Sequence, residues 1–318
     1  MQLPLIYIVG VGRSGTSMLM TLLNGHSKIA FTPETHFLRY YLGTAEIQAG
    51  IEQRGALAFQ QLLETDSYFQ RLNIPAEELL QPYLLGQAPF DLVRVYQQVL
   101  QQYLDRKGKQ TIGDKDPRYL DYLDRIAALF PQAKIIHIYR DPRDVVLSKT
   151  KADWSAHRPY WLNAMISQIQ IQEGRKRGQA LFGEQYYELA YEELVTKPEQ
   201  TLTKLLTFLG LSFEPEMLHL EQSAQELVDS SEIQWKGNTF RPMLKENTQK
   251  WRTALRAEQF TIIENICSEW FIKLGYNRAA TIKASWKSKL LKPLLTWQAP
   301  QRWLYNWQLQ RQMKRGAN

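Results

Sequence analysis

Apolar positions along the chain fall either into short continuous runs or into helical spacing. Residues 5–10 (LIYIVG) and 133–139 (AKIIHIY) are continuous apolar runs that lead into turn residues. Runs of this length and composition predict strands that are buried on both faces of a parallel sheet. Residues 184–191 (EQYYELAY) predict a third strand. Helical spacing predicts helices over residues 16–24, 118–130, 160–176 and 196–211.

This alternation of strands and helices predicts an α/β fold, a P-loop-like doubly wound parallel sheet flanked by helices. We expect one domain over residues 1–282. It contains a mostly helical insertion at about 37–108, in which Pro75, Pro82 and Pro89 break the helices. In such folds ligands bind at the carboxyl ends of the strands, so the loops after the first two predicted strands are the candidate sites.

Residues 283–318 form a basic, tryptophan-rich C-terminal arm. The whole chain of 318 residues has a net charge of +7, and this arm alone holds eight Lys and Arg and no Asp or Glu. Because the rest of the chain is close to neutral, nucleic-acid binding is not favoured. Two interpretations of the arm stay open. It packs on its own domain or on a partner subunit in a homodimer, or it contacts a membrane surface.

Composition limits the cellular setting. No apolar run approaches the ~18 residues of a transmembrane helix, and the N-terminal apolar run leads into a glycine turn rather than a cleavage site. A single cysteine, Cys267, excludes an internal disulfide and a cysteine-based zinc cluster. We therefore expect a cytoplasmic protein, with attachment at the periphery of a membrane as the alternative.

The loop after the first strand has the composition of a phosphate-binding loop. Residues 10–17 read GVGRSGTS, a G-x-x-x-x-G pattern with Thr16 where a Walker A motif has lysine. The glycines let backbone amides converge on an oxyanion at a helix N-terminus, and Arg13 is the nearby cation. The loop therefore suits a 5′-phosphate or a phosphosulfate better than a magnesium-bound triphosphate. The alternative interpretation is a glycine turn without a ligand.

The loop after the second predicted strand also offers an anion site. It reads RDPRDVVLS over residues 140–148, with Arg140 at the strand tip and Ser148 two turns further on. A guanidinium in that position can bind a phosphate through two hydrogen bonds. A capped surface helix with local Arg–Asp pairs is the alternative interpretation.

Together, three segments resemble the PAPS-dependent sulfotransferase superfamily, where PAPS is 3′-phosphoadenosine 5′-phosphosulfate. The glycine loop resembles the family's 5′-phosphosulfate loop, and RDPRDVVLS resembles its 3′-phosphate loop. Residues 190–211 (AYEELVTKPEQTLTKLLTFLGL) resemble a third family motif. Residues 13–37 and 114–143 look most like the tyrosylprotein sulfotransferases and their bacterial relatives. The resemblance covers residues 5 to about 256.

The resemblance implies roles for individual residues. Glu34 is the catalytic base, and Lys115, in a K-D-P segment, contacts the transferring sulfonate. The residues implied to hold PAPS, or its product PAP, are Gly12, Arg13, Ser14, Gly15, Thr16 and Ser17 at the 5′ side, Arg140, Ser148 and Lys250 at the 3′-phosphate, and Tyr191 near the adenine.

The chain departs from the family in two places. The family's transition-state serine has no unambiguous counterpart, and Ser230, Ser231 and Thr239 are the candidates. The tyrosyl branch has an arginine after the catalytic glutamate that helps to hold peptide, and this chain has His36 there.

The chemistry of sulfuryl transfer to an alcohol fits these residues. Glu34 can take the proton of the hydroxyl group, and Lys115 and Arg13 can stabilise the developing negative charge without a metal. We expect a hydroxyl acceptor on a small molecule, a lipid or a glycan, or on a peptide tyrosine. Structural roles remain as alternatives, with Glu34 in a first helical turn and Lys115 paired to a neighbouring aspartate.

Two other functions compete with this one. A P-loop-type phosphotransferase is opposed by Thr16, which stands in the place of the Walker lysine. A non-catalytic nucleotide-binding or membrane-docking protein would bind PAPS or lipid and turn over no acceptor.

Overall fold

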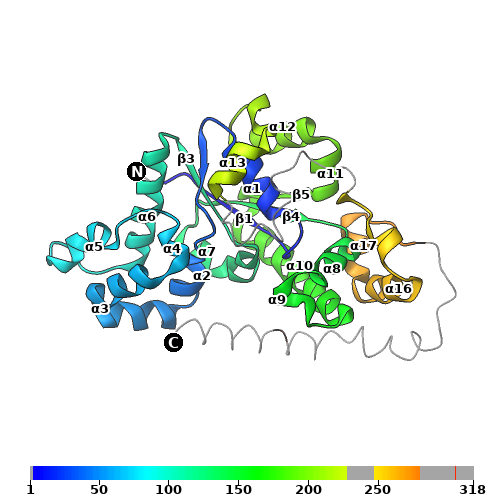
Figure 1. Cartoon of the computed structure of the whole chain (residues 1–318), viewed down its shortest axis with the longest axis horizontal. Helices are drawn as coiled ribbons and strands as arrows, with labels where there is room; N and C mark the ends of the chain where they lie inside the picture. Colours follow the sequence, from blue (N-terminus) through cyan, green and yellow to red (C-terminus); the bar gives the residue numbers. More distant parts are fainter. Residues whose placement is uncertain (1–2, 228–246, 280–304, 306–318) are drawn as a thin grey trace.

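A five-stranded parallel sheet forms the centre of the molecule (Figure 1). The computed structural model describes residues 3–227, 247–279 and 305. The sheet order is β2-β3-β1-β4-β5, with every neighbouring pair parallel. The strands are β1 (Leu5–Val9), β2 (Ile29–Phe31), β3 (Thr111–Lys115), β4 (Lys134–Tyr139) and β5 (Tyr186–Ala190).

Helices cover both faces of this sheet (Figure 1). Those closest to the site are α1 (Thr16–Asn24), α6 (Leu92–Lys107), η1 (Pro117–Tyr122, a 3-10 helix), α8 (Pro142–Lys149), α10 (Tyr160–Phe182) and α11 (Tyr191–Thr196). The others are α2 (Phe37–Tyr41), α3 (Ala45–Thr65), α4 (Ser67–Gln70), α5 (Ala76–Leu84), α7 (Leu123–Leu129), α9 (Asp153–Ala156), η2 (Gly183–Gln185), α12 (Pro198–Leu209), η3 (Pro215–Leu218), α13 (Leu220–Leu227), α15 (Trp251–Ala254), α16 (Ala257–Ile266) and α17 (Ser268–Leu274).

The side chains of β1 alternate between two hydrophobic cores. Tyr7 and Val9 join residues of α6, α7 and α10 in one core, whereas Ile6 and Ile8 join residues of α1 and α12 in the other. Because all of these side chains are almost fully buried, β1 is the central strand of a three-layer α/β/α arrangement. Its carboxyl end therefore lies at the middle of the edge where ligands bind in such folds.

The prediction of an α/β fold with a parallel sheet flanked by helices is confirmed, and the three predicted strands are β1, β4 and β5. Two strands were missed. β2 has only three residues, and β3 reads TIGDK, in which buried polar residues replace the apolar run. The apolar run of β2 is too short, and that of β3 too interrupted, for the hydrophobic pattern on which strand prediction depends.

Three details of the helix prediction were wrong. The segment 118–130 divides into η1 and α7 rather than forming one helix, and α10 continues to Phe182 rather than ending near residue 176. Pro82 lies inside α5 instead of breaking it. Helices α2 to α6 lie within residues 37–107, and the division of the chain into a domain over 1–282 with this insertion and an arm stays a prediction.

Several predictions concern parts of the chain outside the described residues. Ser230, Ser231 and Thr239 are among them, as is the C-terminal arm apart from Tyr305. No helix in the described ranges is long and apolar enough to span a membrane.

Candidate active site

The glycine loop joins β1 to α1 in a tight conformation. Gly15 has φ 99°, in the left-handed region, and a Cβ atom there would lie 2.4 Å from the Tyr191 ring. A Cβ atom on Gly10 would lie 2.5 Å from the carbonyl oxygen of Ile138. These close approaches explain the need for glycine at both positions. The loop therefore packs against Tyr191, the first residue of α11.

The Ser14 hydroxyl in this loop can still form a hydrogen bond to a ligand. Its side chain is fully buried, and its hydroxyl has no hydrogen-bond partner within the described part of the chain. Buried hydroxyls are nearly always hydrogen-bonded in native proteins. An anion held by the loop at the N-terminus of α1 would supply the missing partner.

The second predicted anion loop meets the first. Arg13 donates from Nε to the Ser148 hydroxyl at 3.0 Å, and Arg140 donates to the carbonyl oxygen of Arg13 at 3.3 Å. The Arg140 guanidinium lies over the Tyr191 ring, 4.4 Å from its centroid. The structure therefore brings together four residues that the sequence assigned to the PAPS site from three separate segments.

Two adjacent guanidinium groups make this corner suitable for an anion. Burial, followed by the nearby charge of Arg140, lowers the pKa of Arg13 from its ordinary value. The Nε atom of Arg140 is buried and has no hydrogen-bond partner among the described residues. An anion at this corner would offset the repulsion between the two cations and satisfy that donor.

Lys250 lies beside the same corner. Its Nζ donates to the Asn247 side chain at 2.5 Å, and the backbone carbonyl of Asn247 accepts a hydrogen bond from Arg140. Asp144, on α8, accepts from the backbone amides of Gln249 and Trp251 at 2.7 and 2.9 Å. These bonds fix the segment that carries Lys250 against the helix that carries Ser148.

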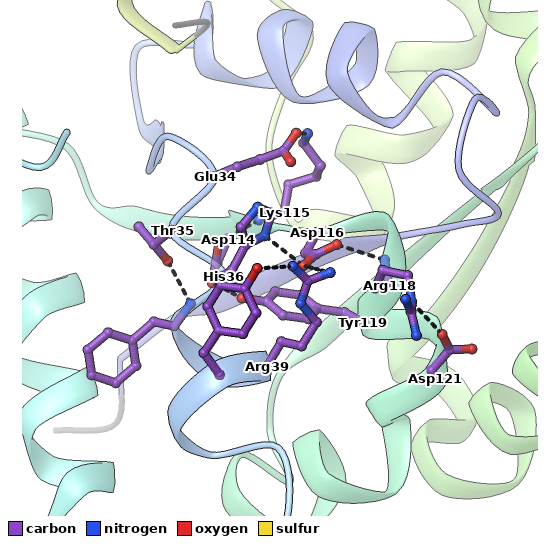
Figure 2. A network of polar contacts seen from close by, with 12 residues as sticks. Glu34, Thr35, His36, Arg39, Asp114, Lys115, Asp116, Arg118, Tyr119 and Asp121 are labelled. Atoms are coloured by element: carbon purple, nitrogen blue, oxygen red, sulfur yellow. Dashed lines mark hydrogen bonds and ion pairs between the residues drawn. The ribbon is translucent and has the colours of Figure 1, made fainter. Parts of the chain in front are cut away.

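Glu34 and Lys115 lie in contact at the other side of the loop (Figure 2). Glu34 follows β2 and Lys115 ends β3, which is the neighbouring strand. Lys115 also donates from Nζ to the Ser17 hydroxyl at 3.1 Å, in the first turn of α1. The Lys115 side chain is almost fully buried and Glu34 is 7% exposed. The predicted base, the predicted sulfonate contact and the glycine loop are thus adjacent.

A buried carboxylate holds the backbone beneath Lys115. Asp114 accepts hydrogen bonds from the hydroxyls of Tyr96 and Tyr119 at 2.6 and 2.7 Å, and from the backbone amide of Lys115. Burial raises the pKa of Asp114, and these hydrogen bonds partly offset that effect. Since Tyr96 belongs to α6, the helical insertion is joined directly to the strand that carries Lys115.

A second carboxylate organises the other side of this segment (Figure 2). Asp116 binds His36 Nδ1 at 2.8 Å, lies 3.3 Å from Arg39 Nη1, and accepts from the backbone amide of Arg118 at 2.8 Å. Burial alone would raise the pKa of Asp116, but Arg39 and His36 hold it well below its usual range. The tyrosyl branch has an arginine at the position of His36. In this chain an arginine, Arg39, follows three residues later and contacts the same carboxylate as His36.

Sequence reasoning missed Asp114, Asp116 and Arg39 as members of the site. The two aspartates flank Lys115 in the sequence and were considered only as its ion-pair partners. They instead bind tyrosines, a histidine and an arginine from other segments, which no spacing along the chain could indicate. Within the described residues no group of three or more His, Cys, Asp or Glu could hold a metal ion, and independence from metal stays a prediction.

The parallel sheet and the phosphate-type loop after its central strand define an α/β protein of the P-loop-like class. Residues 4–215 match the Sulfotransferase family. The chain belongs to this family, which implies PAPS as the sulfuryl donor.

Curated relatives agree with the predicted branch. The chain is 24% identical to chicken protein-tyrosine sulfotransferase 2 over 70% of its length, and 25% identical to the Mycobacterium tuberculosis omega-hydroxy-beta-dihydromenaquinone-9 sulfotransferase Stf3 over 86%. It is 26% identical over 85% of its length to an uncharacterised protein of Aquifex aeolicus. The chain spans 55%, 76% and 33% of these three relatives.

A solved structure shows the same fold. The sulfotransferase domain of the Synechococcus olefin synthase superposes with a TM-score of 0.61 at 23% identity, covering 88% of this chain and 98% of that domain. The predicted resemblance to tyrosylprotein and bacterial sulfotransferases is confirmed.

Proposed function

We propose that this protein transfers a sulfuryl group from PAPS to a hydroxyl acceptor, with Glu34 as the general base. The observation that carries the proposal is the contact between Glu34 and Lys115 next to the glycine loop, since Lys115 also bonds Ser17 of that loop. A base, a cation and a phosphate-type loop within one set of contacts are the groups that in-line transfer between an anionic donor and an alcohol requires.

The residues present fit the donor. The buried Ser14 hydroxyl and the Arg140 Nε both lack partners in the described chain. Ser14 follows Arg13 in the loop, Arg13 bonds Ser148, and Arg140 bonds the Arg13 carbonyl oxygen. Arg140 and Lys250 both donate to Asn247. Ser14 and Arg13 would hold the 5′ side with the loop backbone, and Arg140, Ser148 and Lys250 the 3′-phosphate. Tyr191, under Arg140, would pack near the adenine. PAPS supplies the sulfuryl group when bound.

The chain's own groups then divide the chemistry. Glu34 takes the proton from the acceptor hydroxyl, which makes that oxygen a stronger nucleophile. Lys115 and Arg13 stabilise negative charge on the sulfonate and on the leaving phosphate. The acceptor is a hydroxyl of a small molecule, a lipid or a glycan, or of a peptide tyrosine. His36 and Arg39, two and five residues beyond Glu34, both contact Asp116, the residue that follows Lys115.

The donor site is tested by calorimetric titration with PAP. We expect tight binding of PAP, weaker binding of adenosine 5′-phosphate because it lacks the 3′-phosphate, and no binding of ATP with magnesium. Binding of ATP with magnesium in preference to PAP would instead support the phosphotransferase. If neither nucleotide binds, the PAPS site assigned here is wrong.

The base is tested with Glu34→Gln. Release of PAP from PAPS is followed with a phenol, a primary alkanol and a sugar as acceptors. The variant should lose ~10²- to 10⁴-fold in turnover and still bind PAP. Glu77→Gln, which changes an exposed carboxylate on α5, is the matched control and should keep full activity. A fully active Glu34→Gln would refute the assignment of the base. Binding of PAP without turnover of any acceptor by the unmodified protein would favour a non-catalytic role.

A further inference from the structure

One residue of the C-terminal arm lies against the segment that carries Lys115. Tyr305 is 9% exposed and belongs to the larger hydrophobic core. Its hydroxyl donates to Asp121, in η1. This helix begins two residues after Lys115, so a residue 190 positions further along the chain is bound next to the candidate active site.

Asp121 is the centre of a site that accepts this tyrosine. Besides Tyr305, it accepts hydrogen bonds from Arg118 Nε at 2.9 Å and from Gln170 Nε2, on α10, at 3.2 Å. Asp121 is 8% exposed. A carboxylate so deeply buried needs several donors to offset its desolvation. We define Arg118, Asp121 and Gln170 as the Tyr305 socket.

The socket connects to the groups around Lys115. The backbone amide of Arg118 donates to Asp116, which also binds His36 (Figure 2). On its other side η1 packs closely on α10, because a Cβ atom on Gly174 would lie 2.3 Å from Leu120. The segment is thus fixed by Asp116 at its start and by the socket at its end.

We propose that Tyr305 is a positioning residue, through which the C-terminal arm docks on its own domain and holds the segment 115–122 in place for sulfuryl transfer. The occupant of the socket is therefore Tyr305 of the same chain. The effect on catalysis rests on the function proposed above, whereas the docking itself does not.

Hydrogen exchange of the full-length protein tests the docking. In Tyr305→Ala the amides of residues 118–122 should exchange about tenfold faster, the factor that corresponds to loss of ~1.4 kcal/mol. Tyr305→Phe, which keeps the ring and loses the hydroxyl, should lie between this variant and the wild type. Tyr83→Phe removes a hydroxyl bonded to Gln98 at 3.1 Å in the helical insertion, and as the matched control should leave these amides unchanged.

Catalysis and membrane binding provide the second set of readouts. With the best acceptor of the panel, Tyr305→Phe should lower kcat, and Tyr305→Ala should lower it further. The Kd for PAP should stay the same in both variants. Unchanged exchange in Tyr305→Ala would overturn the docking. Wild-type exchange that rises to the level of that variant on vesicles of phosphatidylserine and phosphatidylcholine would show that Tyr305 leaves the socket at a membrane, and would overturn its positioning role there. Altered exchange with unaltered kcat would overturn the positioning role. Absence of PAP binding in the wild type would count against the proposed function and leave the exchange result valid.

Discussion

Gly15→Ala is the substitution whose effect follows most directly from the geometry of the loop. Gly15 has φ 99°, and a side chain in the left-handed region costs ~1–2 kcal/mol. The new Cβ would also lie 2.4 Å from Cδ2 and 2.9 Å from Cε2 of Tyr191. That ring is 5% exposed and lies under the Arg140 guanidinium, so it has little space to move.

The steric effect adds to the backbone strain. Overpacking of this kind costs ~1–3 kcal/mol, so the total loss of unfolding free energy should be ~2–5 kcal/mol. Gly108→Ala is the matched control. Gly108 also has a positive φ, 61°, but no heavy atom lies within 4 Å of its Cβ position. It should therefore lose only the ~1–2 kcal/mol of backbone strain.

Urea denaturation and PAP titration together measure both effects. Gly15→Ala should lower the unfolding free energy by more than Gly108→Ala. It should also weaken PAP binding at least tenfold, because Tyr191 and Arg140 are displaced, while Gly108→Ala binds PAP normally. Equal destabilisation of the two variants would show that the contact with Tyr191 is not limiting. Unaltered PAP affinity in Gly15→Ala would show that the loop does not hold the nucleotide.

Three further predictions concern the loop after β4 and the helix α8 that follows it. Burial lowers the pKa of Lys149 to about 7. Between pH 7 and the ordinary pKa of lysine, the unfolded state therefore binds a proton that the folded state does not, and stability should rise with pH across this window. Urea midpoints measured over this range should rise less in Lys149→Met. Asp144→Asn leaves one of its two bound amides in segment 249–251 without an acceptor, and should cost ~1–3 kcal/mol in urea unfolding; an unchanged midpoint would contradict this. Arg140→Ala should weaken PAP binding ~10- to 100-fold and adenosine 5′-phosphate binding much less; equal losses would show that it does not serve the 3′-phosphate.

The sequence allowed prediction of the donor side better than the acceptor side. The two anion loops follow strong apolar runs, so their residues were expected together at one sheet edge, and Arg13 and Ser148 are in contact. Glu34 and Lys115 were proposed from resemblance alone, because β2 is too short and β3 too polar to be predicted as strands. The roles of Asp114 and Asp116 depend on partners from distant segments, and such contacts exist only once the sheet has formed.

The strand order has a consequence for how specificity can change in this protein. The loops after β1 and β4 carry the candidate donor site, whereas β2, β3 and the helical insertion carry Glu34, Lys115 and their supports. The central strand therefore lies between these two groups of residues, and the hydrogen bond from Lys115 to Ser17 joins them. An engineer seeking new acceptors could vary the helical insertion and leave the loops after β1 and β4 unchanged. Tyr96 on α6 would have to stay, because its hydrogen bond to Asp114 joins the insertion to the strand that carries Lys115.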